Sequence, residues 1–270
     1  MNYSARWSVL FTHKGQTFDG FARMSTQMIM FLVAGAFCGG FINGLAGTGT
    51  ALFALGFYLV VLDPTRAVAV VVVMAILVGI QGLWVVRHTV LAHPKRVLRF
   101  VVPGLIGVPV GVPLLHVIDA STMRVTVAVF LIVYGGYFSF RTRLPAFSRP
   151  TPKADMLVGL TGGVLGGAAA LAGVVPQIWL SLRPWTKSET RGVLQPFNMA
   201  VMCTAIGLLF LNGAYDKVTL YALMVTIPSG LLGGQTGLWV FGMLSNEMFR
   251  RLLIGLTLVM GLGIVLSEFY

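Results

Sequence analysis

The 270-residue chain is 57% hydrophobic and only 10% charged, and it carries a formal net charge of +11 at pH 7. Its apolar runs are too long to be buried within a soluble domain of this size, since about 20 apolar residues already suffice to cross a bilayer. The composition therefore excludes a soluble globular fold and indicates an all-α polytopic membrane protein.

The positive charge does not indicate a nucleic-acid partner. The Lys and Arg residues lie in short loops between apolar runs, where such residues usually set membrane orientation. Cys38 and Cys203 are far apart in apolar surroundings, with no CxxC spacing and no His cluster beside them. We expect both to be reduced structural thiols.

Eight apolar segments, each predicted to be helical, follow a polar N-terminal tail of residues 1–27. The tail lacks an apolar core of signal-peptide length, so we expect it to remain on the mature protein. The segments are residues 28–62, 67–86, 100–118, 125–140, 156–182, 192–215, 218–244 and 252–267. A basic, Pro-rich linker, residues 141–153, divides the chain into two membrane repeats of four segments each, residues 28–140 and 154–270.

The two halves match at a nearly constant offset, which indicates an internal duplication. Such repeats are common in transporters. At an offset of 125 residues the matches are Thr65 with Thr190, Arg66 with Arg191 and Pro103 with Pro228. At an offset of 126 they are Leu45-Ala46-Gly47 with Leu171-Ala172-Gly173, Gly107 with Gly233, Arg124 with Arg250 and Gly135 with Gly261.

Basic residues are distributed oppositely in the two halves. The second loop of the first half is basic, whereas the corresponding loop of the second half holds only Lys217 and its neighbouring loops are basic. Because cytoplasmic loops collect Lys and Arg, we expect inverted repeats. Inversion requires an odd number of crossings per repeat, so one of the four segments in each half should enter the membrane and turn back.

The first segment of each half is the candidate for a broken or re-entrant helix. Residues 41–53, FINGLAGTGTALF, place three glycines, two threonines and an asparagine inside an uncharged run of 35 residues. Glycine permits irregular backbone, which is tolerated at membrane depth only inside protein or beside a cavity. We therefore expect GLAGTGT and LAGVVPQ to form the tips of two hairpins.

Charge favours the second hairpin more strongly than the first. With both segments re-entrant, 13 Lys and Arg fall on the cytoplasmic side and six outside, whereas a first segment that crosses once gives 16 and three. The alternative is that LAGTG and GGVLGG are only tight helix contacts. The polar residues Asn43, Thr48, Thr50 and Gln177 weigh against it, because polar groups deep in lipid are often functional.

Residues 162–198, GGVLGGAAALAGVVPQIWLSLRPWTKSETRGVLQPFN, resemble the sulfite exporter TauE/SafE family, also called the toluenesulfonate uptake permeases. GFINGLAGTGTALF is similar to that family's amino-terminal glycine-rich motif, although Thr48 and Thr50 stand where members often show a run of glycines. This departure leaves the preferred anion open. The resemblance covers nearly the whole chain after the tail and implies a bacterial inner-membrane transporter for sulfite or organosulfonates, without a metal or organic cofactor.

The chemistry of the tips also indicates an oxyanion. Backbone N–H groups at helix starts, together with hydroxyl and amide donors, can hold several anionic oxygens at once. We expect neutral donors here, with Arg183 and Arg191 either drawing anions toward the second hairpin or only setting orientation. The candidate substrate-binding residues are Asn43, Gly47, Thr48, Gly49, Thr50, Gly173, Val174, Pro176, Gln177, Arg191, Gln195 and Asn198, of which Pro176 has no N–H to donate.

Other classes of function find less support. Ser229 lies in TIPSGL, which is not a GxSxG motif, and no histidine falls plainly within a crossing to activate it, so we do not expect an enzyme. A non-transporting scaffold or sensor remains the alternative to a carrier. The expected partners are a small anion and the lipid bilayer, and the sequence does not decide between a monomer and a homodimer.

Overall fold

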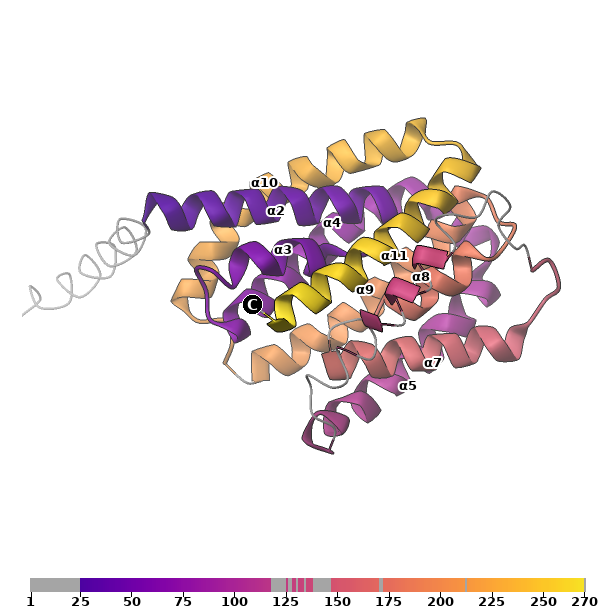
Figure 1. The fold of residues 1–270 in the computed structure, drawn as a ribbon, viewed down its shortest axis with the longest axis horizontal. Helices are drawn as coiled ribbons and strands as arrows, with labels where there is room; N and C mark the ends of the chain where they lie inside the picture. Colours follow the sequence, from indigo (N-terminus) through magenta and orange to yellow (C-terminus); the bar gives the residue numbers. More distant parts are fainter. Residues whose placement is uncertain are drawn as a thin grey trace, which may run out of the picture.

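The computed structural model describes residues 25–117, 147–169, 172–211 and 213–269, together with 125, 128, 129, 131–133 and 135–137. The described residues are helical and form no strand (Figure 1). The helices are α2 (Thr26–Ala46), α3 (Thr50–Tyr58), α4 (Pro64–Ala92), α5 (Pro94–Val117), α7 (Pro152–Ala169), α8 (Val174–Ser181), α9 (Lys187–Leu211), α10 (Lys217–Met243) and α11 (Asn246–Phe269). Most of the tail, part of the predicted segment 125–140 and part of the linker lie outside the described residues.

Five of the described helices are long and apolar enough to cross a membrane. They are Thr26–Ala46, Thr65–Ala92, Lys187–Leu211, Lys217–Met243 and Asn246–Leu266. The all-helical architecture predicted from composition is therefore confirmed. By contrast, α3 and α8 hold nine and eight residues, and at about 1.5 Å per residue neither can span a bilayer core of about 30 Å.

Polar caps set where several helices begin. Helix α9 begins at Lys187, five residues before the predicted start, because Thr186 and Glu189 form a capping box. The Thr186 N–H donates to Glu189 Oε2 at 3.0 Å, and the Glu189 N–H donates to Thr186 Oγ1 at 3.2 Å. Helix α10 begins after Asp216, whose side chain accepts a hydrogen bond of 2.9 Å from the Thr219 N–H.

The first predicted segment breaks and turns back on itself. Helices α2 and α3 together form what we call the first hairpin. Helix α2 ends at Ala46, and Gly47 and Gly49 have φ values of 83° and 95°, which L side chains rarely adopt. Helix α3 then runs back along α2. A Cβ added to Gly39 would lie 2.9 Å from Ala54 Cβ, and one added to Gly35 would lie 2.8 Å from Tyr58 Cε1.

The second hairpin (α7–α8) has the same form. Helix α7 ends at Ala169 and α8 begins at Val174. A Cβ on Gly162 would lie 2.9 Å from Pro176 Cδ, and Trp179 Nε1 donates to Asp155 Oδ1 at 2.8 Å. The end of α8 therefore returns to the start of α7.

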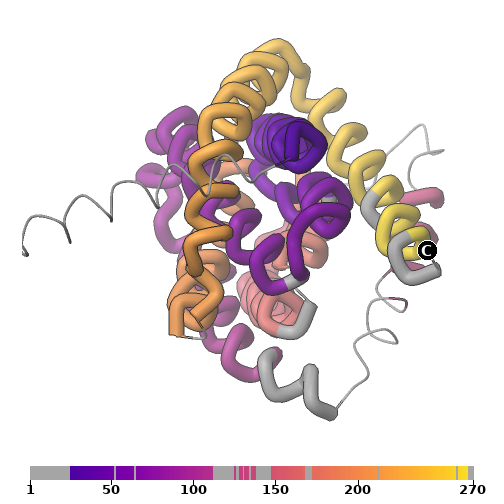
Figure 2. Tube along the Cα trace, turned by 90° about the vertical axis from the view of Figure 1, so that its left-hand side faces the viewer, coloured from indigo at the N-terminus to yellow at the C-terminus, as the bar shows by residue number. Residues whose placement is uncertain are grey.

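Each hairpin packs in parallel against a helix from the other half of the chain. Helix α2 lies beside α10, and α7 lies beside α5 (Figures 1 and 2). A Cβ on Gly44 would clash with the Gly234 carbonyl, and one on Gly163 would clash with the Gly104 carbonyl. The tight-contact interpretation is thus right for the glycines of GGVLGG that face α5, but not for Gly47 and Gly49, which form a turn.

Lys and Arg gather at one end of the bundle, which we call the basic end. Helix α4 runs antiparallel to α9, since a Cβ on Gly192 near the start of α9 would lie 3.4 Å from Thr89 Cγ2 near the end of α4. Helices α5, α7, α9 and α11 begin at this end. The described basic residues at this end are Arg87, Lys95, Arg96, Arg99, Arg149, Lys153, Arg183, Lys187, Arg250 and Arg251. Only Arg66 and Lys217 among the described Lys and Arg lie at the opposite end.

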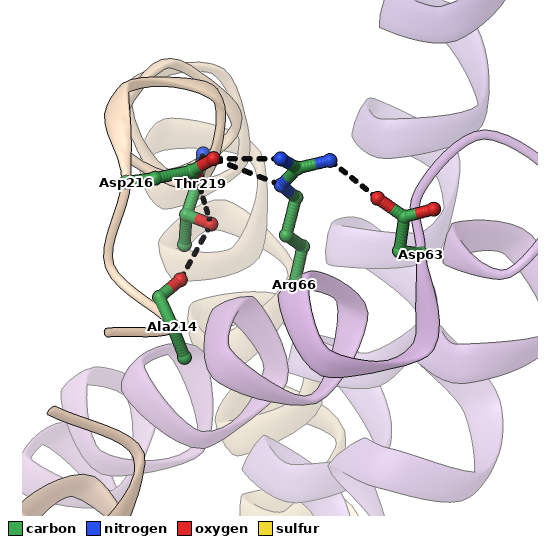
Figure 3. Close-up of polar contacts among 5 residues, drawn as sticks. All are labelled: Asp63, Arg66, Ala214, Asp216 and Thr219. Atoms are coloured by element: carbon green, nitrogen blue, oxygen red, sulfur yellow. Dashed lines mark hydrogen bonds and ion pairs between the residues drawn. The ribbon is translucent and has the colours of Figure 1, made fainter. Parts of the chain in front are cut away.

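At the opposite end, Arg66 joins the start of α4 to the start of α10 (Figure 3). Its Nε and Nη2 donate to Asp216 Oδ2 at 3.0 and 2.8 Å, and its Nη1 pairs with Asp63. Asp63 is the residue before α4, and its carboxylate pairs with Arg66 instead of capping the helix. Burial alone would raise the pKa of the Asp216 carboxyl. Hydrogen bonds from Thr219 and Arg66 outweigh this effect and hold the pKa below its ordinary value of 3.8.

Candidate substrate site

The tips of the two hairpins touch inside the bundle. We call residues 47–49 the first break and residues 172–173, which precede α8, the second break. A Cβ on Gly173 would collide with Thr48 Oγ1 and lie 3.1 Å from Thr48 Cβ. The Thr48 side chain is buried, with 3% of its surface exposed. Two stretches predicted separately as tips, one from each half, are thereby brought to one place.

Two helix N-termini begin at this contact. Gly49 precedes α3 and Gly173 precedes α8, and neither helix has a side-chain cap. Thr50 Oγ1 is buried and has no hydrogen-bond partner among the described residues. Val174 is buried at the start of α8, while Pro176 contributes no N–H and packs on Gly162. The breaks therefore combine two helix starts that lack side-chain caps with a hydroxyl that has no partner among the described residues.

Arg191 reaches the first break from α9 and is fully buried. Its Nη1 donates to the carbonyl oxygens of Gly44 and, at 3.3 Å, of Leu45. Its Nη2 donates to the Asn43 carbonyl oxygen at 3.3 Å and to Gln195 Oε1 at 3.2 Å. The guanidinium also lies over the Phe241 ring, 4.7 Å from its centroid.

These contacts correct the expectation for Arg191. The sequence placed Arg191 at the cytoplasmic flank of the second hairpin, as well as among the substrate-binding candidates, but its charge is buried at the end of α2 in the first hairpin. The C-terminus of α2 carries partial negative charge, which would repel an anion bound at the adjacent start of α3. Arg191 binds the carbonyls responsible and offsets that repulsion.

An amide network holds the same region in place. Asn43 Nδ2 donates to the Ala75 carbonyl oxygen of α4 at 3.0 Å, and Gln195 Nε2 lies 3.4 Å from Asn43 Oδ1. A Cβ on Gly47 would lie 3.1 Å from Gln195 Oε1. Asn43, Gly47, Arg191 and Gln195 are therefore neighbours.

The remaining candidates lie to either side. Gln177 Nε2 donates to the Leu253 carbonyl oxygen at 2.9 Å and to Thr257 Oγ1 at 3.1 Å, which ties α8 to α11. Its Oε1 is buried without a described partner. Asn198 is buried on α9, three residues beyond Gln195.

Arg183 does not have the anion-drawing role considered for it. Its Nη2 pairs with Asp155 Oδ1 at 3.0 Å and with Thr151 Oγ1, and its Nη1 donates to the Arg149 carbonyl oxygen at 2.7 Å. The side chain is buried against Trp179. Arg183 closes the base of the second hairpin.

Two polar residues near the hairpins were missed by the sequence reasoning. Gln81 Oε1 and the Tyr58 hydroxyl are both buried without a partner among the described residues. A polar residue in an apolar helix was the available signal for Gln81. Tyrosine is common in membrane helices, so Tyr58 gave none. Within the described residues no group of three His, Cys, Asp or Glu could hold a metal ion.

Comparison with known families supplies the class of protein. A family model described as Sulfite exporter TauE/SafE matches residues 32–264, which include both hairpins and the contact between their tips. The chain belongs to this family. It is a multi-pass membrane transporter, in agreement with its five apolar helices and with the expectation that it is not an enzyme. Neither the search of curated proteins nor that of solved structures returned a match.

Proposed function

We propose that this TauE/SafE protein moves sulfite or a small organosulfonate across the bacterial inner membrane, and that the anion binds between the two breaks. The observation that carries the proposal is the contact of Thr48 with Gly173, which brings two uncapped helix starts together beside the unpartnered hydroxyl of Thr50. The donors support an oxyanion, and the family supports sulfur.

The balance of charge at this site suits a carrier. Each helix start contributes about half a positive charge, and each neutral donor can be exchanged for water when the anion leaves. Arg191 adds a full charge nearby, but four of its contacts are already made to protein oxygens. It raises the local potential without forming a strong ion pair with the substrate.

The orientation follows from the basic residues. We propose that the basic end faces the cytoplasm, that each hairpin enters the membrane from one side and returns to it, and that the two repeats are inverted. The ten described basic residues at one end against two at the other support this arrangement. The direction of transport is left to experiment.

Flux into proteoliposomes tests the substrate. The purified protein should carry radiolabelled sulfite, and excess unlabelled sulfite or taurine should compete, whereas chloride should not. Sulfate, phosphate and a short carboxylate form the comparison set. If sulfite and sulfonates leave the flux of a transported carboxylate unchanged, the protein is an anion carrier of different specificity. If no anion moves, the carrier function itself is wrong and a scaffold or sensor is favoured.

A further inference from the structure

Tyr58, the last residue of α3, buries a hydroxyl that has no partner among the described residues. None of the Tyr58 surface is exposed, and its ring lies against α2 at Gly35. A buried hydroxyl without a hydrogen bond is destabilising, and phenylalanine would fill the same space without that cost. Packing alone does not account for tyrosine here.

Thr50 and Tyr58 mark the two ends of one helical face. Thr50 Cγ2 lies 3.2 Å from a Cβ placed on Gly39, and Tyr58 faces Gly35, so both side chains lie along the seam between α3 and α2. Eight residues separate them, which is about 12 Å along a helix. The seam leads away from the first break toward the end opposite the basic end.

A third hydroxyl without a partner lies in the same region. Tyr215 precedes Asp216 at the opposite end, packs into the same hydrophobic cluster as Tyr58, and its hydroxyl is also buried without a described partner. Burial raises the pKa of Tyr215, so this hydroxyl stays protonated and can donate. Thr50 at the first break, Tyr58 at the end of α3 and Tyr215 at the opposite end thus each bury a hydroxyl without a described partner.

We propose that the half of the substrate route leading away from the basic end runs along this seam, and that the Tyr58 hydroxyl contacts the oxyanion in transit. The inference rests on the proposed function. A phenol donates one hydrogen bond to an anionic oxygen and carries no charge, so it can guide the anion without retaining it. The described side chains around Tyr58 are closely packed apolar groups, among them Leu32, Val70 and Met74, which must separate during transport.

Tyr58→Phe tests this directly, because it removes one oxygen and keeps the ring. We expect maximal sulfite flux in proteoliposomes to fall at least tenfold, with equilibrium sulfite binding at the breaks within about twofold of wild type. Thermal unfolding should occur at the same or a higher temperature, since no bond of the hydroxyl is lost. Ser229→Ala, which removes an exposed hydroxyl bound to the Val33 carbonyl oxygen, is the control and should keep full flux.

The possible outcomes distinguish a failure of the proposed route from a failure of the proposed carrier function. Wild-type flux in Tyr58→Phe would overturn the route but leave the carrier intact. A lower unfolding temperature would also overturn it, because the hydroxyl would then have a structural partner. Absence of sulfite flux in the wild-type protein would instead overturn the proposed function.

Two ion pairs at opposite ends carry a second, independent inference. Arg66 of α4 pairs with Asp216 at the start of α10, and Arg96 of α5 pairs with Glu189 of α9 at 2.8 Å. The sequence offset relates α4 to α9 and α5 to α10. Each pair therefore joins the second segment of one half to the third segment of the other, with the positions of the charges exchanged.

We infer that the two pairs are reciprocal latches, one closing each end of the substrate route. Both are partly exposed, and such pairs contribute little net stability, so thermal motion can open either one. A carrier needs closures of this strength, because each must open once in every cycle. The latch at Arg66 closes the route past Tyr58, and the latch at Glu189 closes the basic end.

Conservative variants isolate the charge from the caps. Asp216→Asn keeps an N-cap residue and Glu189→Gln keeps a capping box, so both helices still begin correctly. A cysteine at Ala54 on α3, with Cys38 and Cys203 replaced by alanine, reports access by an impermeant maleimide. From the side of Lys217 we expect Asp216→Asn to raise the labelling rate at least threefold and Glu189→Gln to lower it.

The opposite latch gives the opposite shift. From the basic side, Glu189→Gln should raise the Ala54 cysteine labelling rate and Asp216→Asn should lower it. Arg66→Gln should match Asp216→Asn, since it breaks the same pair from the other partner. Labelling rates that change in neither direction would overturn the latches and leave the ion pairs as structural links between helices.

Discussion

At the scale of single residues, a positive charge next to an anion site need not contact the anion. Arg191 donates to the carbonyls of the last turn of α2 and to Gln195, and its Nε is buried without a described partner. It positions the first break and offsets the negative end of α2. A helix C-terminus left without this partner would face the start of α3 with orphaned carbonyls.

Arg191→Met should therefore abolish transport. It removes the charge and leaves buried carbonyls unpaired, and we expect sulfite flux to fall by at least about tenfold. Arg191→Lys should recover part of the loss, because lysine keeps the charge but not the forked geometry. The deficit should be the same at low and high salt, since a buried charge is little screened. A deficit that disappears at high salt would return Arg191 to a steering role.

The glycine at the second break should be sensitive to a single methyl group. In Gly173→Ala the new Cβ meets Thr48 Oγ1, which must rotate away from the site. We expect flux to fall at least about tenfold while folded protein remains. Gly56→Ala, on α3 where a Cβ meets nothing within 4 Å, is the matched control and should transport normally. Equal flux in the two variants would reduce the second break to packing.

At the scale of elements, the sequence predicted where helices break but not how the hairpins pair. Gly47 and Gly49, with Thr48 between them, mark a turn because their φ values are positive. Helix α2 packs on α10 and α7 packs on α5, so each partner comes from the other half of the chain. No periodicity in the sequences of these helices specifies that pairing. Arg191 was placed wrongly for the same reason, since its environment depends on a contact across 147 residues to Gly44.

Glycines in the helix pairs should behave differently from those in the breaks. Gly163→Ala places a Cβ against the Gly104 carbonyl in the α5–α7 pair. The Gly104 carbonyl belongs to the backbone of a helix and cannot rotate away. We expect a lower unfolding temperature and less folded protein, in contrast to Gly173→Ala. A stable, fully folded Gly163→Ala protein would show that the pair tolerates separation and that close packing is not its role.

At the scale of the whole molecule, the hairpins and the basic end support the proposed topology. Residues at Lys95 and Lys187 lie at the same end because Arg96 pairs with Glu189, and Lys217 lies at the other. Arg143, in the basic linker, lies outside the described residues. The two hairpins make this arrangement possible, since α3 and α8 each return to the end from which their helix entered.

Single cysteines should report that topology in intact cells. With Cys38 and Cys203 replaced by alanine, Lys217→Cys should react with an impermeant maleimide added outside. Lys95→Cys and Ser188→Cys should react only after the inner face is opened. Reaction of the positions at 95 and 188 from opposite faces would contradict the shared basic end.

The central claim is that the two breaks form one oxyanion site. Equilibrium binding of sulfite to the purified protein tests it most directly, with Thr50→Val compared with wild type. Loss of a hydrogen bond to a charged ligand costs about 1.5–3 kcal/mol, so Kd should rise roughly tenfold to a hundredfold. Thr236→Val, whose hydroxyl bonds only carbonyls of its own helix, should leave Kd unchanged. An unchanged Kd in Thr50→Val would place the site elsewhere and contradict the account.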